Sequence, residues 1–187
     1  IGILLPTRGV LLKGGPPDVS LVLDMAQRVE EAGLDSVWVG DSLLAKPRLE
    51  PLATLAAIAS RTLRVGLGTA VLLGPLRHPV QLAQMAATVD AISGGRLTMG
   101  IGVGGAFNDT QKAEWAAVGI PHQERGARMT ELVQICKALW TRDGATFRGK
   151  YYQIENATLY PRPVQKGGIP LLLACPLSLV AMKYKYI

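Results

Sequence analysis

The sequence has 187 residues, of which 49% are hydrophobic and 18% are charged. This composition can bury a core as one domain, and it excludes an intrinsically disordered chain. The net charge of +6 comes from scattered Lys and Arg residues, without the basic runs interleaved with aromatic residues that favour nucleic-acid binding. No apolar run approaches the roughly 18 residues of a membrane span, so we expect neither a nucleic-acid nor a membrane partner.

Cysteine and histidine are too sparse to suggest a metal centre. Cys136 and Cys175 stand in unrelated contexts, and only two histidines are present, so we expect no disulfide framework and no metal. The chain opens directly on the strand-like run IGILLP rather than on a charged segment followed by an apolar one. We therefore expect a cytoplasmic protein.

The first third of the chain alternates strands with helices. Residues 1–6 predict a short buried strand, residues 7–18 a Gly- and Pro-rich loop, and residues 20–32 an amphipathic helix. Asp18 or Ser20 is expected to cap this helix, and Gly33 to end it. A second strand at residues 36–40 precedes a helix that begins at Pro51 and runs to residue 61.

The central stretch, residues 62–105, is a strand–helix–strand unit. Its two apolar runs, residues 64–73 and 97–103, do not alternate with polar residues, so each strand should be buried on both faces. The helix between them begins at His78-Pro79 and ends before Gly94-Gly95. Four strands beginning about 30 residues apart predict βα units, and hence a barrel or a doubly wound parallel sheet.

The last third departs from this period. A short helix at residues 111–119, an amphipathic helix at residues 124–140 and a two-stranded excursion at residues 146–159 precede a fifth buried strand at residues 169–174. We thus expect one unit over residues 1–175 and an atypical tail at residues 176–187. The exposed edges of such a sheet favour a homo-oligomer.

Polar and glycine residues gather where the predicted strands end. The glycines of GIGVGG, residues 100–105, either expose backbone amides to an anion or a flat ring, or allow tight packing; they do not complete a GxGxxG fingerprint. Asp41 either forms a hydrogen bond to a cofactor or transfers a proton, or it is a helix N-cap or turn residue. His78 is expected to be a helix cap or a surface residue rather than a catalyst. Cys175 could be a nucleophile, but the sequence shows no partner for it.

Several separated motifs carry a family resemblance. They are AGLDSVWVGDS, the run from GTAVLLG to GIGVGG that contains SGGR, ERGARMTELVQICKALWT, FRGKYYQIENATLYPRPVQ and IPLLLAC. In order and spacing they resemble the bacterial luciferase-like monooxygenase superfamily, most closely its F420-dependent oxidoreductase branch. The resemblance implies an α/β fold of the TIM (β/α)8 type with F420 or FMN bound at the carboxyl ends of the strands. This chain would hold only part of that barrel, because we expect five parallel strands. It would lack strands seven and eight, which form the phosphate grip in the family.

The resemblance also implies site residues, although it leaves the catalytic residue unknown. Thr69, Ala70 and Val71 match a bulge with a non-prolyl cis peptide that presses on the cofactor ring, and Asp41 matches an acid near the ring, a weak catalytic candidate. The remaining cofactor-binding candidates lie at the ends of the first and fourth strands: Pro6, Thr7, Gly104 and Asn108.

Two positions depart from the F420 dehydrogenases of the family. Ser42 stands where some of them have histidine, and Gly105 where they may have glutamate, so their sugar-phosphate substrate is not supported. The sequence therefore predicts a flavin- or deazaflavin-dependent oxidoreductase or monooxygenase acting on a small organic substrate, with F420 favoured by the branch. The alternative from another class is a catalytically silent, truncated half-barrel that oligomerises or holds a cofactor. A phosphate-binding barrel enzyme without a flavin is disfavoured by the missing phosphate loops.

Overall fold

A computed structural model describes residues 1–12 and 14–174. Five parallel strands form one sheet in the order β1-β2-β3-β4-β7: β1 is Gly2–Leu4, β2 is Ser36–Val39, β3 is Gly66–Leu73, β4 is Leu97–Gly102 and β7 is Leu171–Ala174. The predicted α/β fold with five parallel strands is confirmed. Cys175 and the predicted tail at residues 176–187 lie outside the described residues.

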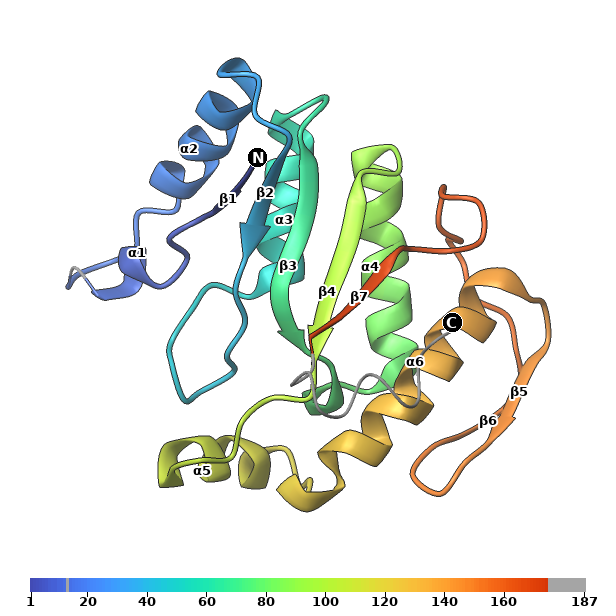
Figure 1. The fold of residues 1–187 in the computed structure, drawn as a ribbon. Helices are drawn as coiled ribbons and strands as arrows, with labels where there is room; N and C mark the ends of the chain where they lie inside the picture. Colours follow the sequence, from blue (N-terminus) through green and yellow to red (C-terminus); the bar gives the residue numbers. More distant parts are fainter. Residues whose placement is uncertain (13, 175–187) are drawn as a thin grey trace.

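Four helices lie along one face of the sheet, and no helix of the described chain covers the opposite face (Figure 1). They are α2 (Ser20–Glu31), α3 (Pro51–Arg61), α4 (Pro79–Ser93) and α6 (Arg125–Thr141). The core lies between the two layers, where strand residues such as Val37, Leu67 and Met99 are buried against helix residues such as Leu55 and Leu82. This arrangement is that of an open, partial barrel, in which the helices form the outer layer.

The longer connections carry the additional elements. One-turn helix α1 (Gly9–Leu12) follows β1, and the 3₁₀ turn η1 (Gly74–Leu76) follows β3. Between β4 and β7 the chain adds α5 (Asp109–Ala117), the 3₁₀ turn η2 (His122–Glu124), α6, and the antiparallel pair of β5 (Ala145–Arg148) and β6 (Gln153–Ala157). The predicted helical and two-stranded insertions before the fifth strand are confirmed.

Two details differ from the sequence-based expectations. The predicted loop at residues 7–18 contains the helical turn α1. The cap position of α2 is held by Val19 without a side-chain bond, while Asp18 accepts from the backbone N–H and hydroxyl of Ser20. The local Asp–Ser bonds therefore form a turn before the helix rather than its cap.

The strands at the two edges of the sheet are less buried than predicted. Leu4 of β1 is 58% exposed and Leu172 of β7 is 54% exposed. Both belong to the face without helices, which we call the inner face; it also carries Trp38, Gly68 and Thr98, which pair with one another and with Leu4 in register. Within the described residues no helix is long and apolar enough to cross a membrane.

Candidate cofactor site at the carboxyl edge

Trp38 is the large aromatic side chain on the inner face of β2, where it lies in register with Leu4 and Gly68. Its indole lies over the backbone of Gly68, where an added Cβ would come within 2.2 Å of Cε3, and its Nε1 donates to the hydroxyl of Ser36 at 2.9 Å. Only glycine at position 68 leaves room for the ring. The indole therefore covers the inner face one layer below the ends of the strands, next to the residues that end them.

The bulge on β3 forms one wall beyond this indole. The register with β4 shifts between Thr69 and Leu72, and the Ala70–Val71 peptide is cis, as the family resemblance implied. The buried Thr69 hydroxyl donates to the carbonyl of Gly100 at 2.7 Å and fixes the bulge to β4. Ala70 is left exposed, so the bulge presents a small apolar surface.

Glycines on β4 make this bulge possible. A Cβ at Gly100 would lie 2.1 Å from the carbonyl oxygen of Thr69, and one at Gly102 would lie 2.8 Å from a methyl of Val71. Any larger residue at either position would push the bulge off β4. The predicted glycine-rich end of β4 thus serves close packing of backbone and side chain against the bulge.

Asp41 ties the ends of β2 and β3 together. Its Oδ2 accepts from the backbone N–H of Leu73 at 2.8 Å and from Nη1 of Arg77 at 2.6 Å, and its Oδ1 accepts from Nη2 of Arg77 at 3.1 Å. The Asp41 side chain is only 2% exposed, and Arg77 also donates to Glu50 at 3.2 Å. Burial alone would lower the pKa of Arg77, but the bonds and charges of Asp41 and Glu50 raise it above its ordinary value.

Both oxygens of Asp41 are therefore occupied by protein donors. The carboxylate positions the loop after β3 in this structure, and its contact with a cofactor ring stays a prediction. Sequence analysis overlooked Arg77. An arginine shortly after β3 and an acid, Asp41, shortly after the preceding strand could have suggested an ion pair, because the two strands were expected in one parallel sheet.

Glu114 on α5 is a second carboxylate that the sequence analysis overlooked. It is 3% exposed, and its Oε1 accepts from the hydroxyl of Ser42 at 3.0 Å and from the backbone N–H groups of Leu44 and Ala45 at 2.7 and 3.1 Å. It thereby fixes the loop after β2 to the helix after β4. Trp115, the next residue in the sequence, is also buried. A large aromatic residue in this short helix could have indicated that the helix packs inward near Glu114.

The remaining predicted residues divide between the edge of the sheet and α5. Pro6 is exposed at the end of β1, and Thr7 beside it is fully buried with a hydroxyl that has no hydrogen-bond partner. Gly104 has a left-handed φ of 75° and packs against Trp115. Asn108 caps α5, because its Oδ1 accepts from the N–H of Gln111 at 2.9 Å. Cofactor contacts of all four stay predictions.

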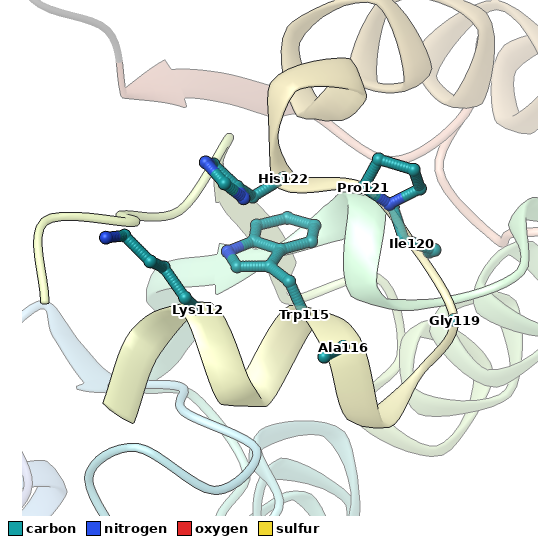
Figure 2. Close-up of a pocket in the computed structure, with 7 residues that line it drawn as sticks. All are labelled: Lys112, Trp115, Ala116, Gly119, Ile120, Pro121 and His122. Carbon is teal, nitrogen blue, oxygen red and sulfur yellow. The ribbon is translucent and has the colours of Figure 1, made fainter. Parts of the chain in front are cut away.

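A surface cavity of about 250 Å³ lies on the other side of Trp115 (Figure 2). Lys112 and His122 flank the indole, whose Nε1 donates to the carbonyl of Gly105 at 2.9 Å. The same side chain meets Gly104 and thus separates this cavity from the end of β4. Among the described residues, no three His, Cys, Asp or Glu side chains gather as a set of metal ligands.

The carboxyl end of β3 and the loops after β1, β2 and β3 thus lie at one edge of the sheet, which we call the carboxyl edge: residues 5–8, 40–50 and 69–78. It combines an apolar bulge, the neighbouring Trp38 indole and loops held by buried carboxylates. In parallel α/β sheets this is the edge at which ligands bind.

Comparison with known proteins identifies related chains. The sequence profile of the luciferase-like monooxygenase family matches residues 1–178. An F420-dependent glucose-6-phosphate dehydrogenase of Amycolatopsis mediterranei is 39% identical over 176 residues, which cover 89% of this chain and 50% of that protein. The chain therefore spans about half the length of the curated relatives it matches.

Solved structures agree with this relationship. The monooxygenase RslO1 from Streptomyces bottropensis superposes with a TM-score of 0.81 at 31% identity, over 92% of this chain and 52% of that one. An F420-dependent secondary alcohol dehydrogenase, solved with an F420–acetone adduct, superposes with a TM-score of 0.70 at 27% identity, over 83% of this chain and 48% of that one. The chain belongs to the luciferase-like monooxygenase family.

Proposed function

We propose that this chain binds the ring of F420, or alternatively of FMN, at the carboxyl edge, as part of an oxidoreductase or monooxygenase that acts on a small organic substrate. The observation that carries the proposal is the glycine-backed bulge at Ala70–Val71 above the Trp38 indole. A flat ring needs an apolar wall that lies close to backbone, and the exposed Ala70 beside the half-buried Val71 provides one. The names of the relatives support F420 over FMN.

The chemistry would come from the cofactor, because a deazaflavin transfers hydride and reacts poorly with oxygen, whereas a reduced flavin can also react with oxygen. The residues of the chain would position the ring. Thr69 anchors the bulge through Gly100, and the Asp41–Arg77 pair holds the loop beside it. Trp38 would limit how deeply the ring enters. We therefore expect packing contacts to orient the ring. We assign proton transfer to none of the described side chains.

We do not extend the proposal to the sugar phosphate in the relatives' names. The Ser42 hydroxyl already donates to Glu114 at 3.0 Å, and Gly105 carries no side chain. Neither position carries an ionisable side chain that could exchange a proton with a sugar hydroxyl. The substrate class we propose is therefore only that of a small organic molecule.

The test is a binding titration of the chain with F420 and with FMN, followed by absorbance and fluorescence. Ala70→Leu places a larger side chain on the proposed ring-binding wall and should weaken ring binding at least tenfold without changing the thermal midpoint. Ala91→Leu, at an exposed position on α4, is the matched control and should bind as the wild type does. Equal binding by Ala70→Leu and wild type would refute the proposed site.

A self-associating half-barrel is a second candidate, favoured by the exposure of Leu4 and Leu172 on the inner face. Large apolar side chains on one uncovered face favour association, and a homo-oligomer would cover them. Sedimentation of the chain alone and with each cofactor separates the two functions. A silent scaffold would associate without saturable ring binding. The cytoplasmic location stays a prediction.

A further inference from the structure

Arg48 occupies an unusual place at the carboxyl edge. Its guanidinium lies against the backbone of Gly40, the residue directly after β2, where an added Cβ would come within 2.7 Å of Nη1 and 3.1 Å of Cζ. The side chain is half-buried rather than extended into solvent. Gly40 therefore makes room for a cation next to Asp41, close to the proposed ring-binding wall.

The guanidinium forms no hydrogen bond or ion pair with any residue that the structure describes, and its Nε is buried without a partner. The nearby carboxylates are engaged elsewhere. Asp41 and Glu50 accept from Arg77, and Glu114 accepts from the loop after β2. A half-buried charge with unfilled donors is costly unless another group pairs with it, so the protein leaves a place for an acceptor here.

A second unfilled donor lies in the adjoining segment. The Thr7 hydroxyl is fully buried and has no partner, and the backbone N–H of Leu49 donates to the carbonyl of Thr7 at 3.2 Å. This bond holds residues 7 and 48–49 side by side. Of the four buried side-chain polar atoms without a partner in the described chain, two belong to this junction, Thr7 Oγ1 and Arg48 Nε.

We propose that Arg48, with Thr7 beside it, binds an oxyanion at the junction of the β1 and β2 loops. The ligand is a phosphate or a carboxylate, since a guanidinium presents its N–H groups in a fork that matches either one. This inference rests on the proposed function in one respect: the anion belongs to the cofactor or the substrate of that site. Both sources share the same chemistry at Arg48.

The first experiment needs no cofactor. The thermal midpoint of the chain is measured in inorganic phosphate and in chloride at equal ionic strength. We expect phosphate to stabilise the wild type, and Arg48→Gln to weaken the apparent phosphate affinity at least tenfold. Arg142→Gln, an exposed arginine after the far end of α6, is the charge-matched control and should respond as the wild type does.

Two further variants separate binding from folding. Gly40→Ala keeps the charge but displaces the guanidinium, and it should weaken the phosphate effect as Arg48→Gln does. Thr7→Val removes a donor of the proposed site and should weaken the stabilisation by phosphate. Because this hydroxyl has no partner within the described protein, the thermal midpoint in chloride should not fall. If the wild type shows no phosphate effect, or if Arg48→Gln keeps it, the proposal is wrong.

Ring compounds with and without an anionic tail identify the source. The pairs are FMN with riboflavin, and F420 with its deazaflavin core that lacks the phosphate-linked tail. If Arg48→Gln abolishes the preference for the tailed compounds, the anion is that of the cofactor. If the preference survives while the phosphate effect is lost, the anion is that of the substrate. If no ring compound binds, the proposed function fails, while the phosphate experiment still decides the anion site.

Discussion

The two ends of the parallel sheet use charged side chains in opposite ways. At the amino end, Arg96 is half-buried and all five of its N–H groups donate to protein oxygens, those of Ala59, Thr62, Val65 and Ser93. At the carboxyl edge, Arg48 is also half-buried and donates to no oxygen that the structure describes. The same side chain thus locks loops together at one end and remains unpaired at the other.

This contrast separates stability from binding. In folds of this kind the amino end supports the structure and the carboxyl end carries the ligand site. The carboxyl edge nevertheless needs rigid loops, and it obtains them from the pair of Asp41 with Arg77 and from Glu114. We therefore expect residues at this edge to fall into two groups: those that hold the loops and those left free for a ligand.

The largest expected effect concerns the pair at the carboxyl edge. Asp41→Ala leaves the mostly buried Arg77 and the N–H of Leu73 without their acceptor, which should lower the free energy of unfolding by about 4 kcal/mol. Denaturant unfolding measures it. Asp24→Ala is the matched control, because it breaks an exposed pair with Arg61 and should cost less than about 1 kcal/mol. Equal losses would show that Asp41 does not hold the loop.

The next effect tests the amino end. Arg96→Ala leaves several carbonyl oxygens before β3 and β4 without a donor, and should cost about 3 kcal/mol of unfolding free energy. Arg64→Ala, at an exposed position two residues before β3, should change it by less than about 0.5 kcal/mol. Arg48→Gln should resemble the Arg64 variant in stability, since Arg48 has no described partner to lose. A large loss for Arg48→Gln would erase the contrast between the two ends.

Glu114 provides an intermediate effect. Glu114→Ala leaves the N–H groups of Leu44 and Ala45 unpaired, and should cost about 2 kcal/mol and speed hydrogen exchange at both amides. All three donors meet the same oxygen, so Glu114→Gln can keep the bonds and should restore most of the protection. If the glutamine variant exchanges as fast as the alanine variant, the negative charge rather than the acceptor geometry holds the loop.

Much of this architecture could be predicted because its signals are local. Apolar runs, the glycines at residues 33 and 94 and the proline at residue 51 define the strands and helices within one or two positions. The bulge and its cis peptide followed from the family resemblance of residues 69–71. The exposure of the inner face could not be predicted in this way. Leu4 and Leu172 belong to apolar runs that indicate burial, but their exposure depends on whether another element covers that face.

The pairing of charges was equally inaccessible. Asp41 and Arg77 lie 36 residues apart, and Ser42 and Glu114 lie 72 apart, so no local pattern joins them. Asp41 was therefore interpreted as a possible catalyst, although its oxygens are taken. Arg48 was not among the predicted site residues, because the sequence alone does not show whether a cation has a partner.

The smallest expected effect is a pH dependence at the amino end. Burial alone would raise the pKa of Glu30, but backbone N–H donors from Val65, Arg64 and Leu63 outweigh it and lower the pKa below the ordinary 4.5. A lowered pKa in the folded state means that this stabilisation is present above about pH 4.5 and is lost as the pH falls through the lower folded-state value. Glu30→Gln should therefore lose less stability than the wild type between pH 5.5 and pH 3. The difference should stay below about 1 kcal/mol because the carboxyl is largely solvated.

Thermal unfolding between pH 5.5 and pH 3 measures this difference. Glu31→Gln, at the exposed neighbouring position, is the control and should follow the wild type. Parallel curves for Glu30→Gln and wild type would mean that these backbone bonds do not depend on the charge of Glu30.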